Sequence, residues 1–299
     1  QETLEQFFAL CEAAGSQQCA LAPEPAERFA ALAERVRAEP VELVDPETGD
    51  AFVFDYQQLI GMTLSALYDP FIYPELADLL AALEDEAQPG QGAAALQRLD
   101  EASALTSTDE FPEFPAYYNY IEGFPGVGCS DSDNPDRHAA WVRAGARADA
   151  RFGYFGRIWT WISSPCAQWP FTDRDRYQGP FTTATANPVL VVGNLYDPAT
   201  RYEGAQVVRA LLPDAALLTV DTPGHTSLGL NACAGLLTGG YLLDPATAPA
   251  IDGTTCAREF NPFELDAQTQ AADGGVQPEL RREVLPEIAY PPPRRTAGN

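Results

Sequence analysis

Two residues that could combine in acid–base chemistry, Asp197 and His225, lie 28 positions apart, and each follows an apolar run. An aspartate that accepts a hydrogen bond from one imidazole nitrogen fixes the tautomer of the ring, and the other nitrogen can then act as a general base. The alternative is that Asp197 is a helix cap before Pro198 and that His225 is an ordinary loop residue. The spacing alone leaves both interpretations open.

The surrounding sequence predicts elements that would bring these two residues together. Residues 189–192 and 217–220 are short apolar runs, which are typical of strands buried on both faces. Residues 199–212 have helical periodicity, so the three segments predict a strand–helix–strand unit with parallel strands. Because catalytic groups of such sheets lie on loops at the carboxyl ends of the strands, we expect Asp197 and His225 at the same edge.

The chain before this unit is predicted to be almost wholly helical over residues 20–180. Apolar residues at helical spacing, interrupted by prolines, indicate helices near 4–11, 25–40, 59–70, 76–89 and 136–162. Residues 230–241 predict one more helix, and the polar, proline-bearing residues 266–299 predict an extended tail.

The composition is strongly acidic, with 18 basic and 43 acidic residues and a formal net charge of −25. Such a surface repels phosphate backbones, which argues against nucleic-acid binding, and it disfavours docking to anionic membranes. No run approaches the roughly 18 apolar residues of a membrane span. Since 45% of the residues are hydrophobic, the sequence predicts a globular protein with a sizeable core and no membrane span.

The six cysteines form an even set without any Cys-x-x-Cys pair. Six cysteines allow about 15 pairings. We favour sequential pairing, which closes short local loops: Cys11 with Cys19, Cys129 with Cys166, and Cys233 with Cys256. Disulfides indicate an oxidising compartment, so we expect a secreted protein, with buried free thiols in a cytosolic protein as the alternative. Because the chain has only two histidines, no metal site is expected.

Several motifs carry a family resemblance. They are Thr185-Ala-Asn-Pro-Val-Leu-Val-Val-Gly, Asp197-Pro-Ala-Thr-Arg-Tyr-Glu-Gly-Ala, Gly224-His225-Thr, Cys233, Tyr241-Leu242, and the stretch from Pro249 to Cys256. In this order they resemble the C-terminal part of the tripeptidyl-aminopeptidase-like, proline-iminopeptidase-related branch of the α/β-hydrolases. Upstream, Cys129 and Cys166-Ala-Gln-Trp-Pro look like the lid of that family. Arg201 departs from the pattern, because the family commonly has proline there.

The resemblance implies an α/β fold class, namely the C-terminal part of an α/β-hydrolase parallel sheet with a large, mainly helical lid domain. Residues 1–20 would be a core helix leading to the lid, 21–180 the lid, 181–265 the C-terminal part of the core, and 266–299 the tail. The resemblance also implies that Asp197 and His225 are the acid and the histidine of a catalytic triad that uses no cofactor.

The nucleophile of this triad is expected on another segment. The nucleophile elbow of the fold is Gly-x-Ser-x-Gly, and it precedes the acid and the histidine in the chain. None of the nine serines has glycine at both the −2 and the +2 position, and the chain opens at Gln1 without an initiator Met. We therefore expect a partner, an N-terminal α/β-hydrolase segment or a separate chain of roughly 100–200 residues, that supplies the serine and the remaining strands.

Three acidic residues of the predicted lid, Glu110, Glu113 and Glu122, are candidates for substrate binding. The resemblance implies that lid carboxylates receive the free amine of a peptide substrate, although solvated surface acids are the alternative in so acidic a chain. His138, the second histidine, is expected to be an exposed residue at a helix start.

The leading hypothesis is a secreted serine hydrolase, an aminopeptidase that releases short peptides from free N-termini. An esterase of the same fold is one alternative, because one triad serves both kinds of acyl group. A non-catalytic binding protein that lacks the serine is the other.

Overall fold

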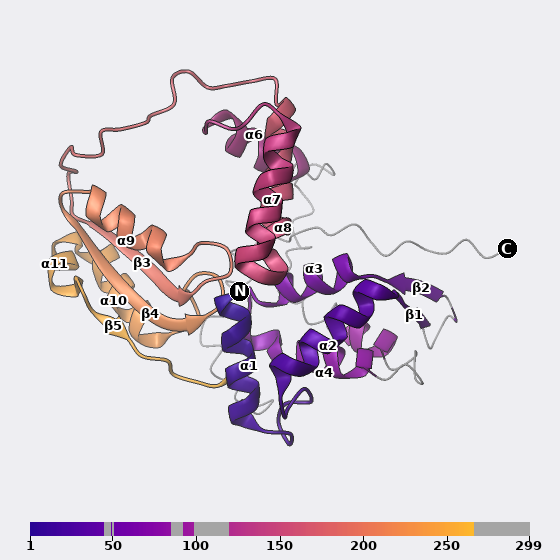
Figure 1. Ribbon diagram of the computed structural model, residues 1–299. Helices are drawn as coiled ribbons and strands as arrows, with labels where there is room; N and C mark the ends of the chain where they lie inside the picture. The colour runs from indigo at the N-terminus through magenta and orange to yellow at the C-terminus, as the bar shows by residue number, and fades with distance from the viewer. Residues whose placement is uncertain (45–48, 50, 85–91, 99–119, 266–299) are drawn as a thin grey trace. The chain divides into compact units, whose positions relative to one another are not determined.

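The computed structural model describes residues 1–44, 49, 51–84, 92–98 and 120–265 (Figure 1). The chain forms two compact units, one of residues 109–180 with Gln1, and the other of residues 2–108 and 181–299. The described residues 21–44, 51–84 and 92–98, which were predicted as part of the lid, lie in the same unit as the sheet. Both loops of the predicted site lie in this larger unit.

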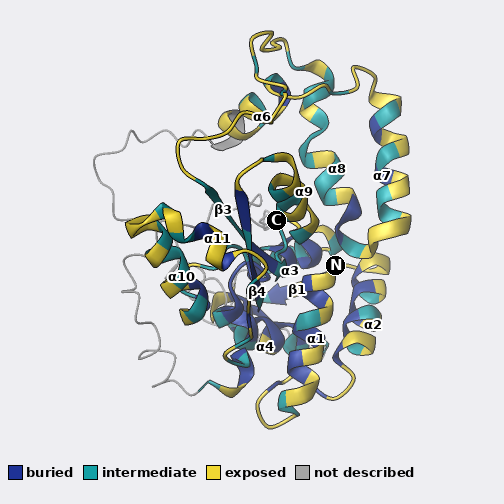
Figure 2. Cartoon of the chain, turned by 90° about the vertical axis from the view of Figure 1, so that its left-hand side faces the viewer, coloured by how far each residue is buried: buried dark blue, intermediate teal, exposed yellow. Residues whose placement is uncertain are grey.

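Four helices make up the helical region of the larger unit, which we define as residues 2–84. They are α1 (Glu2–Ala14), α2 (Pro25–Ala38), α3 (Tyr56–Ala66) and α4 (Tyr73–Glu84), with a short 3-10 helix, η1 (Pro70–Ile72), before α4. Each of the four helices turns one apolar face inward, as the dark blue stripes of Figure 2 show. Residues 92–98 are also helical.

Local sequence signals explain where two of these helices begin. Pro25 is the first residue of α2, a position where the missing N–H is not needed. At α3, the Asp55 carboxylate accepts a hydrogen bond from Gln58 N at 2.9 Å, and the Gln58 side chain accepts one from Asp55 N at 2.8 Å. This capping box starts the helix at Tyr56, three residues before the predicted apolar face.

The expectation that residues 20–180 are almost wholly helical is wrong over several described stretches, among them the irregular segment 169–180 and a pair of strands. Strands β1 (Val41–Val44) and β2 (Ala51–Phe54) form an antiparallel hairpin. Pro40 ends the preceding helical pattern, and the β-branched and aromatic residues of the two segments favour strands over helix. In β1, Leu43 points into the core while Glu42 faces solvent.

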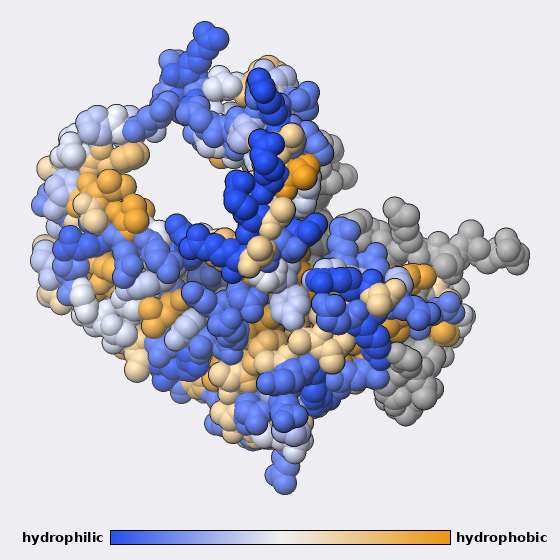
Figure 3. Space-filling model, viewed as in Figure 1, coloured by the Kyte–Doolittle hydropathy of each residue, from blue (hydrophilic) through white to orange (hydrophobic). Residues whose placement is uncertain are grey.

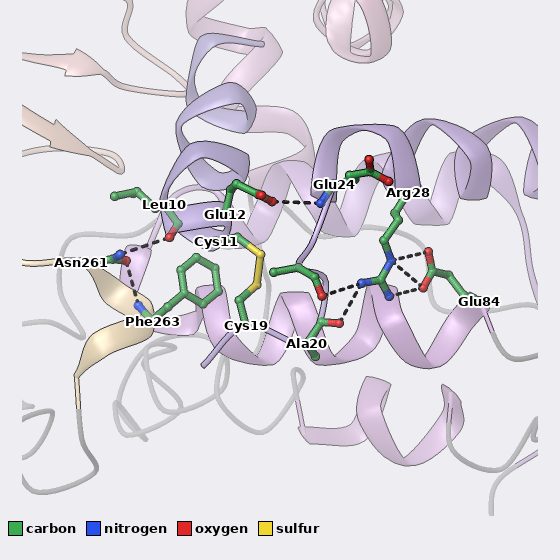
Figure 4. Close-up of a disulfide and its surroundings, with 11 residues drawn as sticks. Leu10, Cys11, Glu12, Cys19, Ala20, Glu24, Arg28, Glu84, Asn261 and Phe263 are labelled. Carbon is green, nitrogen blue, oxygen red and sulfur yellow. Dashed lines mark hydrogen bonds and ion pairs between the residues drawn. A yellow bond between two sulfur atoms is a disulfide. The ribbon is translucent and has the colours of Figure 1, made fainter. Parts of the chain in front are cut away.

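Residues 261–263 contact α1 near the point where this helix ends (Figure 4). The disulfide between Cys11 and Cys19 closes the turn after α1. Asn261 donates from its side-chain nitrogen to the Leu10 carbonyl at 3.1 Å, and the ring of Phe263 packs edge-on against Phe7. These contacts tie residues near 261 to the helical region.

A parallel sheet of three strands in the order β3-β4-β5 forms the remainder of the larger unit. Strand β3 (Val189–Tyr196) pairs with β4 (Ala215–Pro223), which pairs with the two-residue β5 (Thr255–Cys256). The connection from β3 to β4 is α9 (Tyr202–Leu211), and α10 (Ala232–Leu243), η4 (Pro245–Thr247) and α11 (Ala248–Ile251) lead to β5. The predicted parallel strand–helix–strand unit and the α/β fold class are confirmed.

The prediction that both strands are buried on both faces holds for β4 but is wrong for β3. Residues 189–192 of β3 are only half-buried, whereas Leu218 and Val220 of β4 are fully buried. Among the described residues, β3 pairs with β4 alone, so one of its edges has no strand beside it. Helix α9 has no buried residue, and Figure 3 shows hydrophobic residues gathered over it.

The smaller unit is helical in its described part. It contains α6 (Tyr120–Ser130), α7 (His138–Phe152), η2 (Gly153–Phe155), α8 (Gly156–Ile162) and η3 (Ser164–Gln168), so the helix predicted over 136–162 is broken at Gly153. Helices α7 and α8 lie so close that a Cβ at Gly156 would clash with the Ala148 carbonyl oxygen. The Cys129–Cys166 disulfide joins α6 to η3.

The three disulfides are the pairs that sequential pairing predicts, the third being Cys233–Cys256 between α10 and β5. Within the described ranges, no helix has both the length and the apolar character needed to cross a membrane.

Candidate active site

Asp197 directly follows β3 and organises the turn that leads to α9. One carboxylate oxygen, Oδ1, accepts hydrogen bonds from Ala199 N at 2.8 Å and Thr200 N at 2.7 Å. The other, Oδ2, accepts one from Thr200 Oγ1 at 2.9 Å. Asp197 therefore organises residues 198–200, but it is not the helix cap of the alternative interpretation, because Arg201 occupies the N-cap position of α9.

The same carboxylate also contacts His225, which lies two residues after β4. Nδ1 of His225 is 2.9 Å from Oδ2 and 3.0 Å from Oδ1 of Asp197. Because an ionised carboxylate can only accept, Nδ1 carries a proton, and in the neutral ring Nε2 then keeps its lone pair. The side chains of His225 and Asp197 are 16% and 4% exposed, so the pair is largely shielded from water.

The electrostatics of Asp197 favour its charged form. Burial raises the pKa of this carboxyl, but the hydrogen bonds from His225, Thr200 and Ala199 outweigh it and hold the pKa below its usual value. Asp197 is therefore an ionised acceptor at neutral pH, as a residue that orients an imidazole must be.

Tyr68, a residue of the helical region, contacts the loop around His225, residues 224–227, which we call the histidine loop. The His225 backbone N–H donates to the Tyr68 carbonyl at 2.8 Å, and the two rings meet edge-on with centroids 5.2 Å apart. Gly224 is required here, since its φ is +103° and a Cβ would lie 2.8 Å from Pro70 Cδ. The sequence analysis missed Tyr68, and the glycine before the histidine was the one signal of a close approach.

The other predicted site residues are not brought to this pair by the described structure. Glu110 and Glu113 lie outside the described residues, and Glu122 lies on α6 with a side chain that the structure does not describe. His138 is exposed at the first position of α7, as expected, with its ring 5.6 Å from that of Trp161.

No serine completes the pair within the described part of the chain. No serine hydroxyl there forms a hydrogen bond with His225, and Ser227 follows it by only two positions. The arrangement thus provides a charged acid and an oriented imidazole, which are two of the three groups that acyl transfer by a serine hydrolase needs.

The comparison with protein families agrees with this geometry. Residues 150–256, which include both Asp197 and His225, match the family model described as "TAP-like protein". Residues 150–256 are thus similar to the TAP-like branch of the α/β-hydrolase superfamily, as the resemblance predicts.

Individual relatives carry two kinds of name. The chain is 29% identical over 251 residues to the protein named "Carboxylesterase B" of Mycobacterium tuberculosis, which covers 80% of this chain and 44% of the relative. It is 31% identical over 144 residues to "Tripeptidyl aminopeptidase" of Streptomyces coelicolor, which covers 46% of this chain and 26% of that protein. A protein of the same name from Streptomyces lividans matches to the same extent. The chain spans less than half the length of these relatives.

Proposed function

We propose that this chain supplies the acid and the histidine of a serine hydrolase that acts as an aminopeptidase, releasing short peptides from free N-termini. The observation that carries the proposal is the hydrogen bond between His225 Nδ1 and the buried Asp197 carboxylate. The match of residues 150–256 to the TAP-like hydrolase family supports the reaction class.

The chemistry of the two residues follows from their geometry. Nε2 of His225 takes the proton of the serine hydroxyl as its oxygen attacks the substrate carbonyl, and later gives this proton to the leaving amine. Water then repeats the sequence on the acyl-enzyme. Asp197 keeps Nδ1 protonated and stabilises the imidazolium that forms in both steps.

The serine is proposed to come from an N-terminal α/β-hydrolase segment or chain outside these 299 residues. Two observations support this partner. No Gly-x-Ser-x-Gly occurs in the sequence, and within the described residues one edge of β3 has no strand beside it. An open parallel edge exposes unpaired donors and acceptors, and a further strand would satisfy them.

The substrate is proposed to be a peptide, with an ester as the second candidate. The relatives named tripeptidyl aminopeptidase favour the peptide, and the relative named carboxylesterase favours the ester. Recognition of a free amine is proposed for Glu110, Glu113 and Glu122, which stay predictions. The three disulfides support a proposed extracellular location.

Two measurements on the native protein test the proposal. A fluorophosphonate probe should label a serine on the partner segment, and His225→Ala should abolish labelling. Peptidyl anilides with a free amine should be cleaved faster than their N-acetylated forms and faster than nitrophenyl esters. Preference for the esters would select the esterase, whereas absence of both labelling and turnover would select a non-catalytic binding protein.

A further inference from the structure

Asn194, near the end of β3, makes contacts that the proposed triad does not itself require. The residue is 4% exposed, and its side-chain nitrogen donates to two backbone carbonyls of the histidine loop, those of Gly224 at 3.1 Å and Thr226 at 2.6 Å. These two carbonyls belong to the residues on either side of His225. One amide group therefore holds the backbone before and after the histidine.

The orientation of this amide is fixed by its surroundings. A carbonyl oxygen can only accept, so the Asn194 nitrogen must face Gly224 and Thr226 while its oxygen, Oδ1, faces away. Within the described residues, Oδ1 is buried without a hydrogen-bond partner. Burying an acceptor without a hydrogen bond lowers stability, so stability alone does not explain an asparagine at this position.

The loop that Asn194 holds is under backbone strain next to the histidine. Thr226 has a φ of +66°, which is unusual for a β-branched residue. Its N–H donates to Asp197 Oδ2 at 3.2 Å while its carbonyl accepts from Asn194. Strained conformations persist where the surrounding structure over-determines them, and here two side chains from the β3 end do so.

We propose that Asn194 is a positioning residue for His225: it fixes the peptide groups on both sides of the histidine, and with Asp197 it keeps Thr226 in the left-handed conformation that aims the imidazole at the carboxylate. The inference rests on the proposed function, because it assigns Asn194 to the same site. The sequence around His225 does not reveal this role, because Asn194 lies near the end of β3 and the residues that it contacts lie after β4.

The test compares Asn194→Ala with a matched control, Asn231→Ala, in the native protein. Asn231 has the same residue type and the same 4% exposure, and it also bonds the backbone with both side-chain atoms, to Ala234 N and the Ala257 carbonyl, each at 2.9 Å. It caps α10 and makes no hydrogen bond with the histidine loop or the Asp197 turn. A merely structural asparagine should therefore behave like Asn231.

The expected result separates geometry from stability. Asn194→Ala should lower kcat by about 10- to 100-fold with KM changed by less than about twofold, the size of effect that a small misplacement of a catalytic group produces. Asn231→Ala should lower the unfolding midpoint and leave kcat within about twofold. If Asn194→Ala does not fold, Asn194→Asp keeps the shape but replaces the donor, and it should show the same loss.

A second readout needs no substrate. The chain has only two histidines, and the variants His138→Gln and His225→Gln assign their signals in imidazole NMR spectra of the histidine-labelled native protein. Asn194→Ala should shift or broaden the His225 signals and leave those of His138 unchanged. Unchanged His225 signals with kcat within twofold, or equal effects of Asn231→Ala, would overturn the inference. The spectra test it even if the native protein proves to hydrolyse nothing.

Discussion

The helical region, residues 2–84, and the sheet region, which we define as residues 189–256, lie in one compact unit yet bury their apolar side chains differently. In the helical region, Leu4, Phe7 and Leu80 are fully buried. In the sheet region, α9 buries nothing, and Leu236 and Leu243 of α10 are 78% and 90% exposed. An amphipathic pattern becomes a core only where another surface covers it, and the sheet region lacks such a cover on its outer helices.

The candidate functional side chains are distributed in the opposite way, with most of them in the sheet region. Asp197, His225 and Asn194 all belong to the sheet region, whose strands end at the same edge. The helical region contributes the backbone carbonyl and the ring of Tyr68. The helical region therefore buries most of its apolar side chains, while the sheet region carries the candidate catalytic groups and exposes apolar residues on its outer helices.

The largest effect is expected from removing the charge of Asp197 at the proposed active site. Asp197→Asn should lower kcat of the native protein by about 10⁴-fold with little change in folding, because His225 loses the acceptor that fixes its tautomer. Asp55→Asn is the matched control in the helical region, since asparagine also caps helices well. The assignment fails if Asp197→Asn keeps near wild-type turnover in steady-state assays.

The second prediction compares two leucines on helices. Leu80→Ala in α4 removes a fully buried side chain and should lower the free energy of unfolding by about 2–5 kcal/mol. Leu236→Ala in α10 removes an exposed one and should cost less than about 0.5 kcal/mol in these 299 residues alone.

Urea unfolding of both variants, followed by circular dichroism, checks this difference. In the native protein with its proposed partner, Leu236→Ala should instead weaken association of the two parts. Equal destabilisation by both substitutions in the chain alone would show that α10 is covered after all.

In the sheet region, the sequence predicted the position of the strands correctly but predicted the burial of β3 wrongly. The apolar runs 189–192 and 217–220 define the strands, and their spacing places Asp197 and His225 on neighbouring loops. Burial of β3 could not be predicted, because a buried strand and a strand awaiting a neighbour have the same apolar pattern. The family resemblance then added roles that spacing alone had left open.

Contacts between residues distant in the chain could not be predicted from hydrophobic periodicity. The hydrogen bonds from His225 to Tyr68 and from Asn194 to the histidine loop join residues that are distant in the chain, and no local motif encodes them. The β1–β2 hairpin was missed for a related reason, since two four-residue strands give too short a pattern to override a helical expectation.

The third prediction compares one disulfide from each region. In the chain-entropy description, a cross-link stabilises more when it closes a longer loop. Cys11–Cys19 in the helical region spans 8 positions, and Cys233–Cys256 in the sheet region spans 23. Replacing both cysteines by serine should therefore cost about 1 kcal/mol more in the sheet region. Thermal unfolding of the two double variants measures this, and a greater loss from the shorter loop would contradict it.

The smallest expected effect is a difference in pH dependence between two carboxyls. The pKa of Asp197 in the sheet region is lowered in the folded state by hydrogen bonds that outweigh its burial. The pKa of Glu75 in the helical region is raised by burial, with Asp78 and Asp69 adding to the shift, and its Oε2 is buried without a hydrogen-bond partner in the described residues. The two groups should therefore change stability in opposite directions as the pH changes.

For Asp197, the unfolded chain binds the proton more tightly, so its contribution is present above about pH 4 and is lost as the pH falls through the lower folded value. For Glu75, the folded chain binds the proton more tightly, so its contribution is present below about pH 4 and is lost as the pH rises through the raised folded value. Unfolding free energies of wild type, Asp197→Asn and Glu75→Gln measured from pH 3 to 7, in steps of about one pH unit, test this. As the pH rises, the unfolding free energy of the wild type should increase relative to that of Asp197→Asn and decrease relative to that of Glu75→Gln. If the curve of either variant runs parallel to that of the wild type, the sign assigned to that carboxyl is refuted.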